Sequence, residues 1–360
     1  MKRITLLLAV AALLFVYSCK NKSAETANIS LTPEAGTSYH AGVVVPVKLT
    51  SGSAFSLDSV VYFIDSTRIA SKKDTSALLL KTDTLYLGPR VLTAKVYNGG
   101  KSQDISTNVV LYAAKAPVEY SYSVEKTFPH DTGSYTEGLV YHDGFLYESG
   151  GGYLISPNAS IPADGQSSVR KVDLTTGKVL QKVMIDPHVF GEGISIVGNK
   201  IFQLTWTSKI AYEYDLNSLK LLRTLPNNVG VEGWGMCTDG NKLYMDDSTN
   251  RIWFLDKITY QAKGFIDVYD DNKAIDSINE LEYVDGKIYA NIYQTNDIII
   301  IDPKTGAVLA KVDLSKLYPE PRTPPAEVMN GIAWDDKGKR LFVTGKKWQH
   351  LYQIKISPKP

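Results

Sequence analysis

Apolar and polar residues alternate in short runs over most of the chain, as they do in β-strands with one buried face. Between about Ser30 and Ala116, turn-rich segments separate five such runs. The runs are Val43–Leu49, Ser59–Ile64, Ala77–Leu80, Val91–Tyr97 and Thr107–Tyr112. No long segment in this region has the helical period of ~3.6 residues, so we expect a small β-sandwich over residues 30–116.

Beyond Pro117 the strand pattern becomes repetitive. Five copies share one scheme: a polar or aromatic residue usually followed by glycine, then a turn ending in glycine, then an apolar and aromatic strand. The turn glycines are Gly144, Gly198, Gly240, Gly286 and Gly338. In four copies an aspartate and a turn follow a further strand, at Asp173, Asp215, Asp256 and Asp302. Residues 117–360 give about 49 residues per copy, which suits a four-stranded blade, so we expect an all-β chain with a five-bladed β-propeller.

The first 19 residues have the pattern of a secretory signal. Lys2-Arg3 precede the apolar run Ile4–Val16, whose 13 residues are too few for a membrane span of ~20. Cys19 follows where the sequence resembles the lipobox of bacterial lipoproteins, which implies cleavage before Cys19 and its acylation. We therefore expect an extracytoplasmic chain anchored to a membrane by lipid, with residues 20–29 as a polar tether. The alternative is a plain signal peptide with a chance cysteine.

Charge and cysteine content exclude several classes of protein. Lys and Arg number 39 and Asp and Glu 38, and this near-neutral balance argues against nucleic acid as a partner. Two cysteines cannot form a cysteine-rich zinc site, and the five histidines include no pair spaced three or four residues apart. We expect no catalytic metal and no required cofactor. Asp246-Asp247 would suit a structural calcium ion, although solvated turn acids are the more common explanation.

The glycine turns predict which side chains meet at one end of the propeller. Residues equally distant from such a turn pair across antiparallel strands, which places Glu192 beside Trp206. The same rule places Asn279 beside Tyr293 in the fourth copy and Asn330 beside Lys346 in the fifth. Innermost strands surround one axis, so the rim residues of different blades converge at one mouth. The side chains expected there are Glu192, Trp206, Trp234, Asn279, Tyr293, Asn330 and Lys346. Together they predict a pocket for a small polar group.

Ten short motifs of this region occur in the order and spacing of one enzyme family. They include Tyr135-Thr136-Glu137-Gly138-Leu139, Phe190-Gly191-Glu192-Gly193, Glu232-Gly233-Trp234-Gly235, Asn279-Glu280-Leu281-Glu282-Tyr283 and Thr344-Gly345-Lys346. Between Phe128 and Trp348 the chain resembles the plant and bacterial type of glutaminyl-peptide cyclotransferase, which is unrelated to the zinc-dependent animal enzymes. The resemblance implies closure of an N-terminal glutamine of a peptide or protein into pyroglutamate, with release of ammonia. The first domain is similar to immunoglobulin-like modules of secreted bacterial proteins, and we expect it to act as a spacer.

The resemblance assigns the central role to Glu192, which matches the family's catalytic glutamate. It would carry the proton from the attacking to the departing nitrogen, and shielding by Phe190, Trp206 and Trp234 would raise its pKa. The two tryptophans would also enclose the methylene groups of the glutaminyl side chain. The structural alternatives are a carboxylate paired with a neighbouring blade and ordinary packing of aromatics between blades.

The remaining rim residues have supporting or altered roles. Lys346 and Asn279 are candidate donors to the substrate's amide oxygen, and Asn330 is interpreted as channel lining. Their alternatives are a Lys–Glu or an Asn–backbone contact. Glu137 stands where the family usually has glutamine, and Tyr293 where it usually has tryptophan. These departures leave open a second hypothesis, a non-catalytic propeller that binds peptide N-termini or another small ligand.

Overall fold

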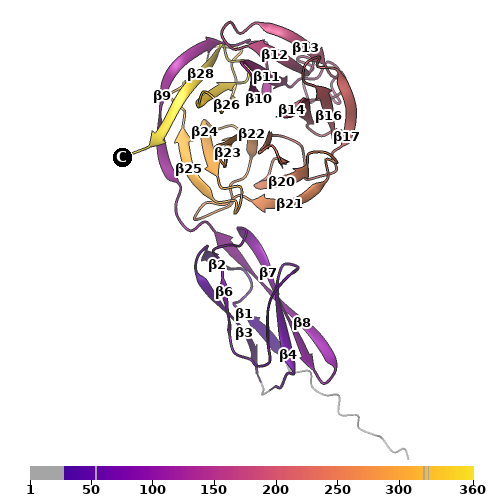
Figure 1. The fold of residues 1–360 in the computed structure, drawn as a ribbon, viewed down its shortest axis with the longest axis vertical. Helices are drawn as coiled ribbons and strands as arrows, with labels where there is room; N and C mark the ends of the chain where they lie inside the picture. The colour runs from indigo at the N-terminus through magenta and orange to yellow at the C-terminus, as the bar shows by residue number, and fades with distance from the viewer. Residues whose placement is uncertain (1–27, 53–54, 319–320, 323) are drawn as a thin grey trace, which may run out of the picture.

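The computed structural model describes residues 28–52, 55–318, 321–322 and 324–360, which form two all-β domains (Figure 1). Cys19 and the expected signal segment lie outside the described residues, as does the expected tether up to residue 27. The first strand begins at Ile29, so the last residue of the expected tether belongs to the first domain. No helix in the described part of the chain has the length and hydropathy needed to cross a membrane.

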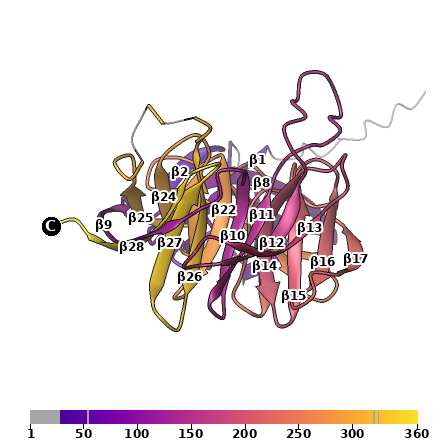
Figure 2. The ribbon, with the colours of Figure 1, turned by 90° about the horizontal axis from the view of Figure 1, so that it is seen from above.

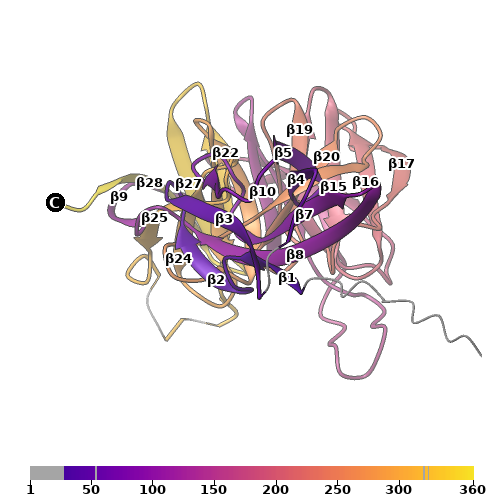
Figure 3. The same ribbon diagram turned by 90° about the horizontal axis from the view of Figure 1, so that it is seen from below.

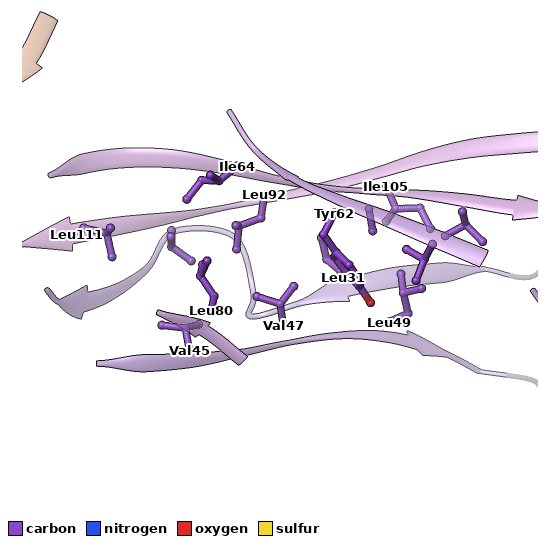
Figure 4. Packing of buried hydrophobic residues seen from close by; sticks show 14 of the residues in the cluster. Leu31, Val45, Val47, Leu49, Tyr62, Ile64, Leu80, Leu92, Ile105 and Leu111 are labelled. Atoms are coloured by element: carbon purple, nitrogen blue, oxygen red, sulfur yellow. The ribbon is translucent and has the colours of Figure 1, made fainter. Parts of the chain in front are cut away.

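The first domain is a sandwich of two sheets. The smaller sheet has the order β1-β3-β6, formed by β1 (Ile29–Thr32), β3 (Val44–Ser51) and β6 (Leu78–Lys81). The larger has the order β2-β8-β7-β4-β5, formed by β2 (Thr37–His40), β8 (Lys101–Tyr112), β7 (Gly88–Asn98), β4 (Ser59–Ile64) and β5 (Thr67–Lys72). Alternate residues of β3, β4 and β7 are buried, and Val45, Val47, Tyr62 and Leu92 meet in the core between the sheets (Figure 4). The five expected strands are present, and β1, β2 and β5 are additional.

The second domain is a ring of five four-stranded blades. The first three blades are continuous in sequence. They consist of β10 (Thr136–His142), β11 (Phe145–Gly150), β12 (Ser168–Asp173) and β13 (Val179–Met184); β14 (Gly191–Val197), β15 (Lys200–Thr205), β16 (Ile210–Asp215) and β17 (Leu221–Pro226); and β18 (Met236–Thr238), β19 (Lys242–Asp246), β20 (Arg251–Asp256) and β21 (Ala262–Asp267). In each, the first strand is innermost and all pairings are antiparallel.

The last two blades show how the ring closes. The fourth contains β22 (Ile278–Val284), β23 (Lys287–Ile292), β24 (Asp297–Ile301) and β25 (Val308–Asp313). The fifth combines β26 (Met329–Asp335), β27 (Arg340–Gly345) and β28 (His350–Pro358) with β9 (Val118–Pro129). Because β9 precedes the first blade in sequence and pairs antiparallel with β28, it joins the two ends of the domain (Figure 1). The inner strands follow one another around the ring, and β10 lies against β26. The expected fold class is confirmed.

The repeated aspartates make one local turn four times. Asp173, Asp215, Asp256 and Asp302 each end or directly follow the third strand of a blade. In each case the carboxylate accepts a backbone N–H two or three residues further on, at 2.8 to 2.9 Å. Such Asx turns direct the chain into the fourth strand. The repeated aspartates of the sequence therefore mark these local turns.

The two domains are in contact through backbone and side chains. Leu87 N donates to Thr305 O at 3.1 Å, which links the sandwich to the fourth blade. Arg90 is buried, and its Nη2 lies 3.3 Å from Oδ2 of Asp267 on β21. The rings of Tyr112 and Tyr269 lie 5.9 Å apart beside these contacts. The sandwich thus packs against the third and fourth blades.

Candidate active site

Four of the five inner strands have a β-bulge near the same end. The register shifts lie at Thr136/Gly138, Gly191/Ile194, Ile278/Leu281 and Met329/Ile332. The residues inside these shifts include Glu137, Glu192, Asn279 and Asn330. A bulge bends its strand and redirects a side chain, so it turns these four polar residues away from the regular in-out alternation.

Because of the bulges, the observed strand pairing differs from the pairing that was expected from the turns. Glu192 does not lie opposite Trp206, because Gly191 pairs with Thr205 and the extra residues are taken up before Ile194. The backbone N–H of Trp206 instead donates to the backbone carbonyl of Phe190 at 3.0 Å. The expected pairs in the fourth and fifth blades are displaced in the same way. The turn glycines set the register near the turn, but not beyond the bulge.

Glycines at the rim ends of the inner strands permit these strands to approach closely. A Cβ on Gly193 would lie 2.4 Å from the carbonyl oxygen of Trp234 in the next blade. A Cβ on Gly235 would lie 2.1 Å from the carbonyl oxygen of Asn279 in the blade after that. Any side chain at these positions would push neighbouring blades apart. The repeated pair of rim residue and glycine therefore reflects packing around the axis.

A cavity of about 270 Å³ lies where the rim residues meet. Eight of the nine residues expected at the site line it: Glu137, Phe190, Glu192, Trp206, Trp234, Asn279, Tyr293 and Lys346. Five further residues complete the described walls: Tyr135, Tyr153, Ile161, Pro162 and Asp164. Most of these five come from the segment between β11 and β12, which projects from one face of the propeller (Figures 2 and 3). The wide spacing between Gly144 and Gly198 was the sequence signal for this insertion.

Asn330 is not part of the cavity wall. It is fully buried, and its Nδ2 donates to the carbonyl of Thr136 at 3.0 Å and to Oε2 of Glu137 at 3.3 Å. The interpretation of Asn330 as channel lining therefore does not match its position outside the wall of this cavity. Asn330 holds the carboxylate of Glu137 in place from below.

Aromatic rings form most of the apolar wall. Phe190 and Trp206 meet edge to face with centroids 5.9 Å apart, and Tyr153 contacts the other side of Phe190 at 5.3 Å. Across the cavity, the rings of Trp234 and Tyr293 lie 5.3 Å apart at an angle of 70°. Edge-to-face pairs of this kind fix ring positions and give a rigid apolar enclosure for methylene groups.

Lys346 forms an ion pair with Glu137. Its Nζ is 2.7 Å from Oε1 of Glu137, and both side chains are almost fully buried. The ammonium also lies 4.6 Å from the ring centroid of Tyr135 and 5.5 Å from that of Tyr293. Burial disfavours the ammonium form, but the charges of Glu137 and Glu192 outweigh this effect and raise the pKa of Lys346. The cavity therefore contains a stable cation.

The carboxyl group of Glu192 lies in the cavity without a hydrogen-bond or ion-pair partner among the described residues. The residue is 5% exposed. Burial, followed by the negative charge of Glu137, raises its pKa well above the ordinary value, although Lys346 acts in the opposite direction. A buried carboxyl group with a raised pKa is suited to accept a proton and return it.

The Asn279 amide is also incompletely used by the protein. Its side chain is 3% exposed, and its Oδ1 is buried without a hydrogen-bond partner among the described residues. Buried amides are normally fully paired, and an unmade bond is costly. Unused capacity in the cavity wall is expected of a side chain that contacts a substrate.

Asp246 and Asp247, the possible calcium ligands, bond to protein groups. Oδ2 of Asp246 accepts the N–H of Gly235 at 2.9 Å, and Oδ1 of Asp247 accepts the hydroxyl of Thr249 at 2.6 Å. The described residues contain no group of three or more His, Cys, Asp and Glu side chains with metal-ligand geometry. The calcium alternative stays a prediction.

Comparisons with known proteins agree with this site. A family model described as glutamine cyclotransferase matches residues 95–356. The glutaminyl-peptide cyclotransferase of Arabidopsis thaliana is 38% identical over 233 residues, which cover 64% of this chain and 69% of that protein. The crystal structure of Myxococcus xanthus glutaminyl cyclase matches with a TM-score of 0.60 and 29% identity, over 68% of this chain and 100% of that one. The resemblance expected from the motifs is confirmed: the chain belongs to the glutamine cyclotransferase family.

Proposed function

We propose that this chain is a glutaminyl-peptide cyclotransferase in which Glu192 carries the proton. The enzyme acts on peptides with an N-terminal glutamine. The observation that carries the assignment of Glu192 is its buried, unpaired carboxyl group in the same cavity as Lys346 and the aromatic wall. Family membership supports the activity, and the geometry of the cavity supports the roles of its residues.

The reaction makes one bond and breaks one. The neutral α-amine attacks the γ-carbonyl carbon of its own side chain, which forms the ring C–N bond and places negative charge on the carbonyl oxygen. Glu192 accepts a proton from the attacking nitrogen and returns it to the side-chain nitrogen. The C–N bond to that nitrogen then breaks, and ammonia and pyroglutamyl peptide are released. Since the attack is intramolecular, the protein has to hold the substrate in its folded-back conformation and to transfer the proton.

Lys346 and the Nδ2 group of Asn279 are proposed to stabilise the transient oxyanion, whereas the unpaired Oδ1 of Asn279 can only accept a hydrogen bond. An ammonium has three donors, and Glu137 is the acceptor of one of them. The remaining donors are available to the carbonyl oxygen as its charge develops. Preorganised donors in a cavity with little water are effective because they need no reorganisation during the reaction.

The aromatic wall has a binding role in this proposal. Trp206, Trp234 and Phe190 enclose the two methylene groups of the glutaminyl side chain, while Tyr293 lies against the indole of Trp234. Because these rings exclude water from the cavity, they strengthen the polar contacts inside it. The wall thus contributes to substrate affinity and to the raised pKa of Glu192.

No metal takes part in the proposed steps, because the side chains named above account for each proton and charge that moves. The expected result is full activity after dialysis against EDTA. A loss of ammonia release that added zinc or calcium restores would overturn this part of the proposal.

The test of function is conversion of Gln-Ala-amide by the purified protein. Released ammonia and a matching mass loss in the peptide are the expected results, with Asn-Ala-amide as an unreactive control. The non-catalytic alternative is not favoured by the family comparisons. It would require calorimetric binding of the peptide with no change in its mass.

We also propose that the chain is anchored by lipid at Cys19 outside the cytoplasm. The support is the order of Lys2-Arg3, the apolar run Ile4–Val16 and the cysteine. Growth with a labelled fatty acid should label the wild type in the membrane fraction. The Cys19→Ser variant should remain unlabelled, and equal labelling of both would contradict the proposal.

A further inference from the structure

A second cavity adjoins the candidate active site. It has a volume of about 180 Å³, and Tyr135 and Asp164 line both cavities. Three cationic side chains also line it: Arg170 of β12, Lys182 of β13 and Lys347, the residue after the lysine of the active site. A ligand in the first cavity thus has a positively charged space as its neighbour.

Lys182 is the least neutralised of these cations. Lys347 has two acidic neighbours, Glu327 at 3.1 Å and Asp164 at 3.8 Å, and Arg170 has Asp131 at 2.9 Å. No described residue forms an ion pair with Lys182. Asp164 is the one carboxylate among the described walls, and Lys182 is the wall cation that no ion pair with a described residue balances.

Two of the cations face each other across neighbouring strands. Arg170 and Lys182 are paired positions in the antiparallel ladder of β12 and β13. Like charges directly opposite each other destabilise a sheet. Partial burial, followed by the charge of Arg170, lowers the pKa of Lys182, while Asp131 and Glu148 act in the opposite direction. An anion between the two side chains would relieve their repulsion.

The protein holds Arg170 in place without using all of its donors. The residue is 4% exposed, its Nη1 donates to Asp131, and its Nε lies 3.9 Å from Oε2 of Glu148 without a hydrogen bond. Nη2 lies beside Gly150, which lines the cavity. The hydroxyl of Ser168, a buried residue of the same wall, also has no partner among the described residues. The wall therefore contains a fixed cation and unpaired donors, as an anion site requires.

We propose that the second cavity binds a substrate carboxylate located one residue after the glutamine, an inference that rests on the proposed cyclotransferase function. Two sources offer this group: the side chain of an acidic second residue and the free C-terminus of a Gln dipeptide. The small volume of the cavity suits a single side chain or terminus. With the glutaminyl side chain in the first cavity, the next group of the peptide passes Tyr135 and Asp164 and reaches Lys182 and Arg170.

The experiment compares kcat/KM for three peptides: Gln-Ala-amide, Gln-Glu-amide and Gln-Ala with a free carboxylate. The expected result is a preference of about threefold or more for at least one acidic peptide over Gln-Ala-amide at low salt, since an exposed ion pair contributes a modest amount. Which acidic peptide is preferred identifies the source of the carboxylate. The preference should decrease at high salt because the pair is partly exposed.

Lys182 gives the matching variants, because it is exposed on the outer strand of its blade and its replacement should not affect folding. Lys182→Gln should remove most of the preference, and Lys182→Glu should reverse it, while activity on Gln-Ala-amide stays unchanged. Lys263→Gln, an exposed lysine on β21 of another blade, is the control and should keep the preference.

The possible outcomes distinguish failure of the second binding site from failure of the proposed cyclotransferase function. Equal kcat/KM for all three peptides, or an acid preference that Lys182→Glu leaves intact, would overturn the second site while the cyclotransferase function stands. If none of the peptides releases ammonia, the proposed function itself is wrong.

Discussion

The ammonium of Lys346 lies 2.7 Å from Oε1 of Glu137, so this carboxylate neutralises the cation of the active site. Oε2 of the same carboxylate accepts a hydrogen bond from Asn330. Two contacts therefore hold the carboxylate of Glu137 in the site. It also places a negative charge next to Glu192.

The Glu137→Gln variant tests the influence of that charge. The carboxylate of Glu137 raises the pKa of Glu192, so its removal lowers that pKa. Glu192 must be deprotonated to accept a proton, and the acid limb of the kcat–pH profile should therefore move to lower pH. Glu213→Gln, which removes a buried acid of the second blade outside the cavity, is the control. A shift of the limb to higher pH would contradict the proposed coupling.

Removal of Lys346 should affect stability and activity in separable ways. Lys346→Gln leaves Glu137 buried without its counter-ion, and the free energy of unfolding should fall by about 3 kcal/mol. In the double variant Glu137→Gln/Lys346→Gln, most of that loss should be recovered in urea unfolding. Both variants lack the oxyanion donor, so kcat should fall about 100-fold in each. A double variant with wild-type kcat would show that Lys346 has only a structural role.

Trp206→Ala should weaken substrate binding more than it slows the reaction. Trp206 is half-buried, lines the cavity and contacts the edge of Phe190. Loss of the indole removes part of the enclosure around the substrate methylenes, and KM should rise about tenfold with a smaller change in kcat. Trp334→Ala, a half-buried tryptophan that is not in the cavity wall, should leave KM unchanged. A rise in KM for both variants would indicate a general loss of structure.

Glu148 should make the chain sensitive to acid. Burial by itself would raise its pKa, but His130, Arg170 and Ser134 outweigh burial and hold the pKa at about 2. Because the folded-state pKa is depressed, this stability is present above the unfolded-state pKa of about 4.3 and is lost as the pH falls toward 2. The free energy of unfolding should decrease by about 3 kcal/mol over that range. The pH dependence should be shallower in Glu148→Gln, and equal slopes would contradict this role.

The blade architecture was predictable because its signals are local. Each Asp turn, such as that at Asp173, needs only a carboxylate and the backbone of the next few residues. The strands β3, β4 and β7 were also visible, because their buried and exposed residues alternate regularly. The short strands β1, β2 and β5 have fewer alternating positions and depend on their neighbours in the sheets, so they were missed.

The composition of the site was more predictable than its geometry. Six residues of the cavity wall could be assigned to the mouth because blade repeats bring equivalent positions together, whereas Glu137 and Phe190 were assigned from the family resemblance. The bulges depend on contacts between blades, such as that of Gly193 with Trp234, and no turn or period encodes them. The same limit explains Asn330, which bonds to Glu137 of another blade, and the wall residues Tyr153 and Pro162 of the projecting segment.

The central claim is that Glu192 carries the proton during cyclisation. The most direct measurement is the rate of ammonia release from Gln-Ala-amide at saturating substrate by wild type, Glu192→Gln and the control Glu213→Gln, at a temperature at which all three are folded. Among these variants, Glu192→Gln alone should lose about 1,000-fold in kcat, which is within the rate contribution typical of a general acid–base residue. If Glu192→Gln retains kcat within about threefold of wild type, then Glu192 does not carry the proton and the proposed mechanism is wrong.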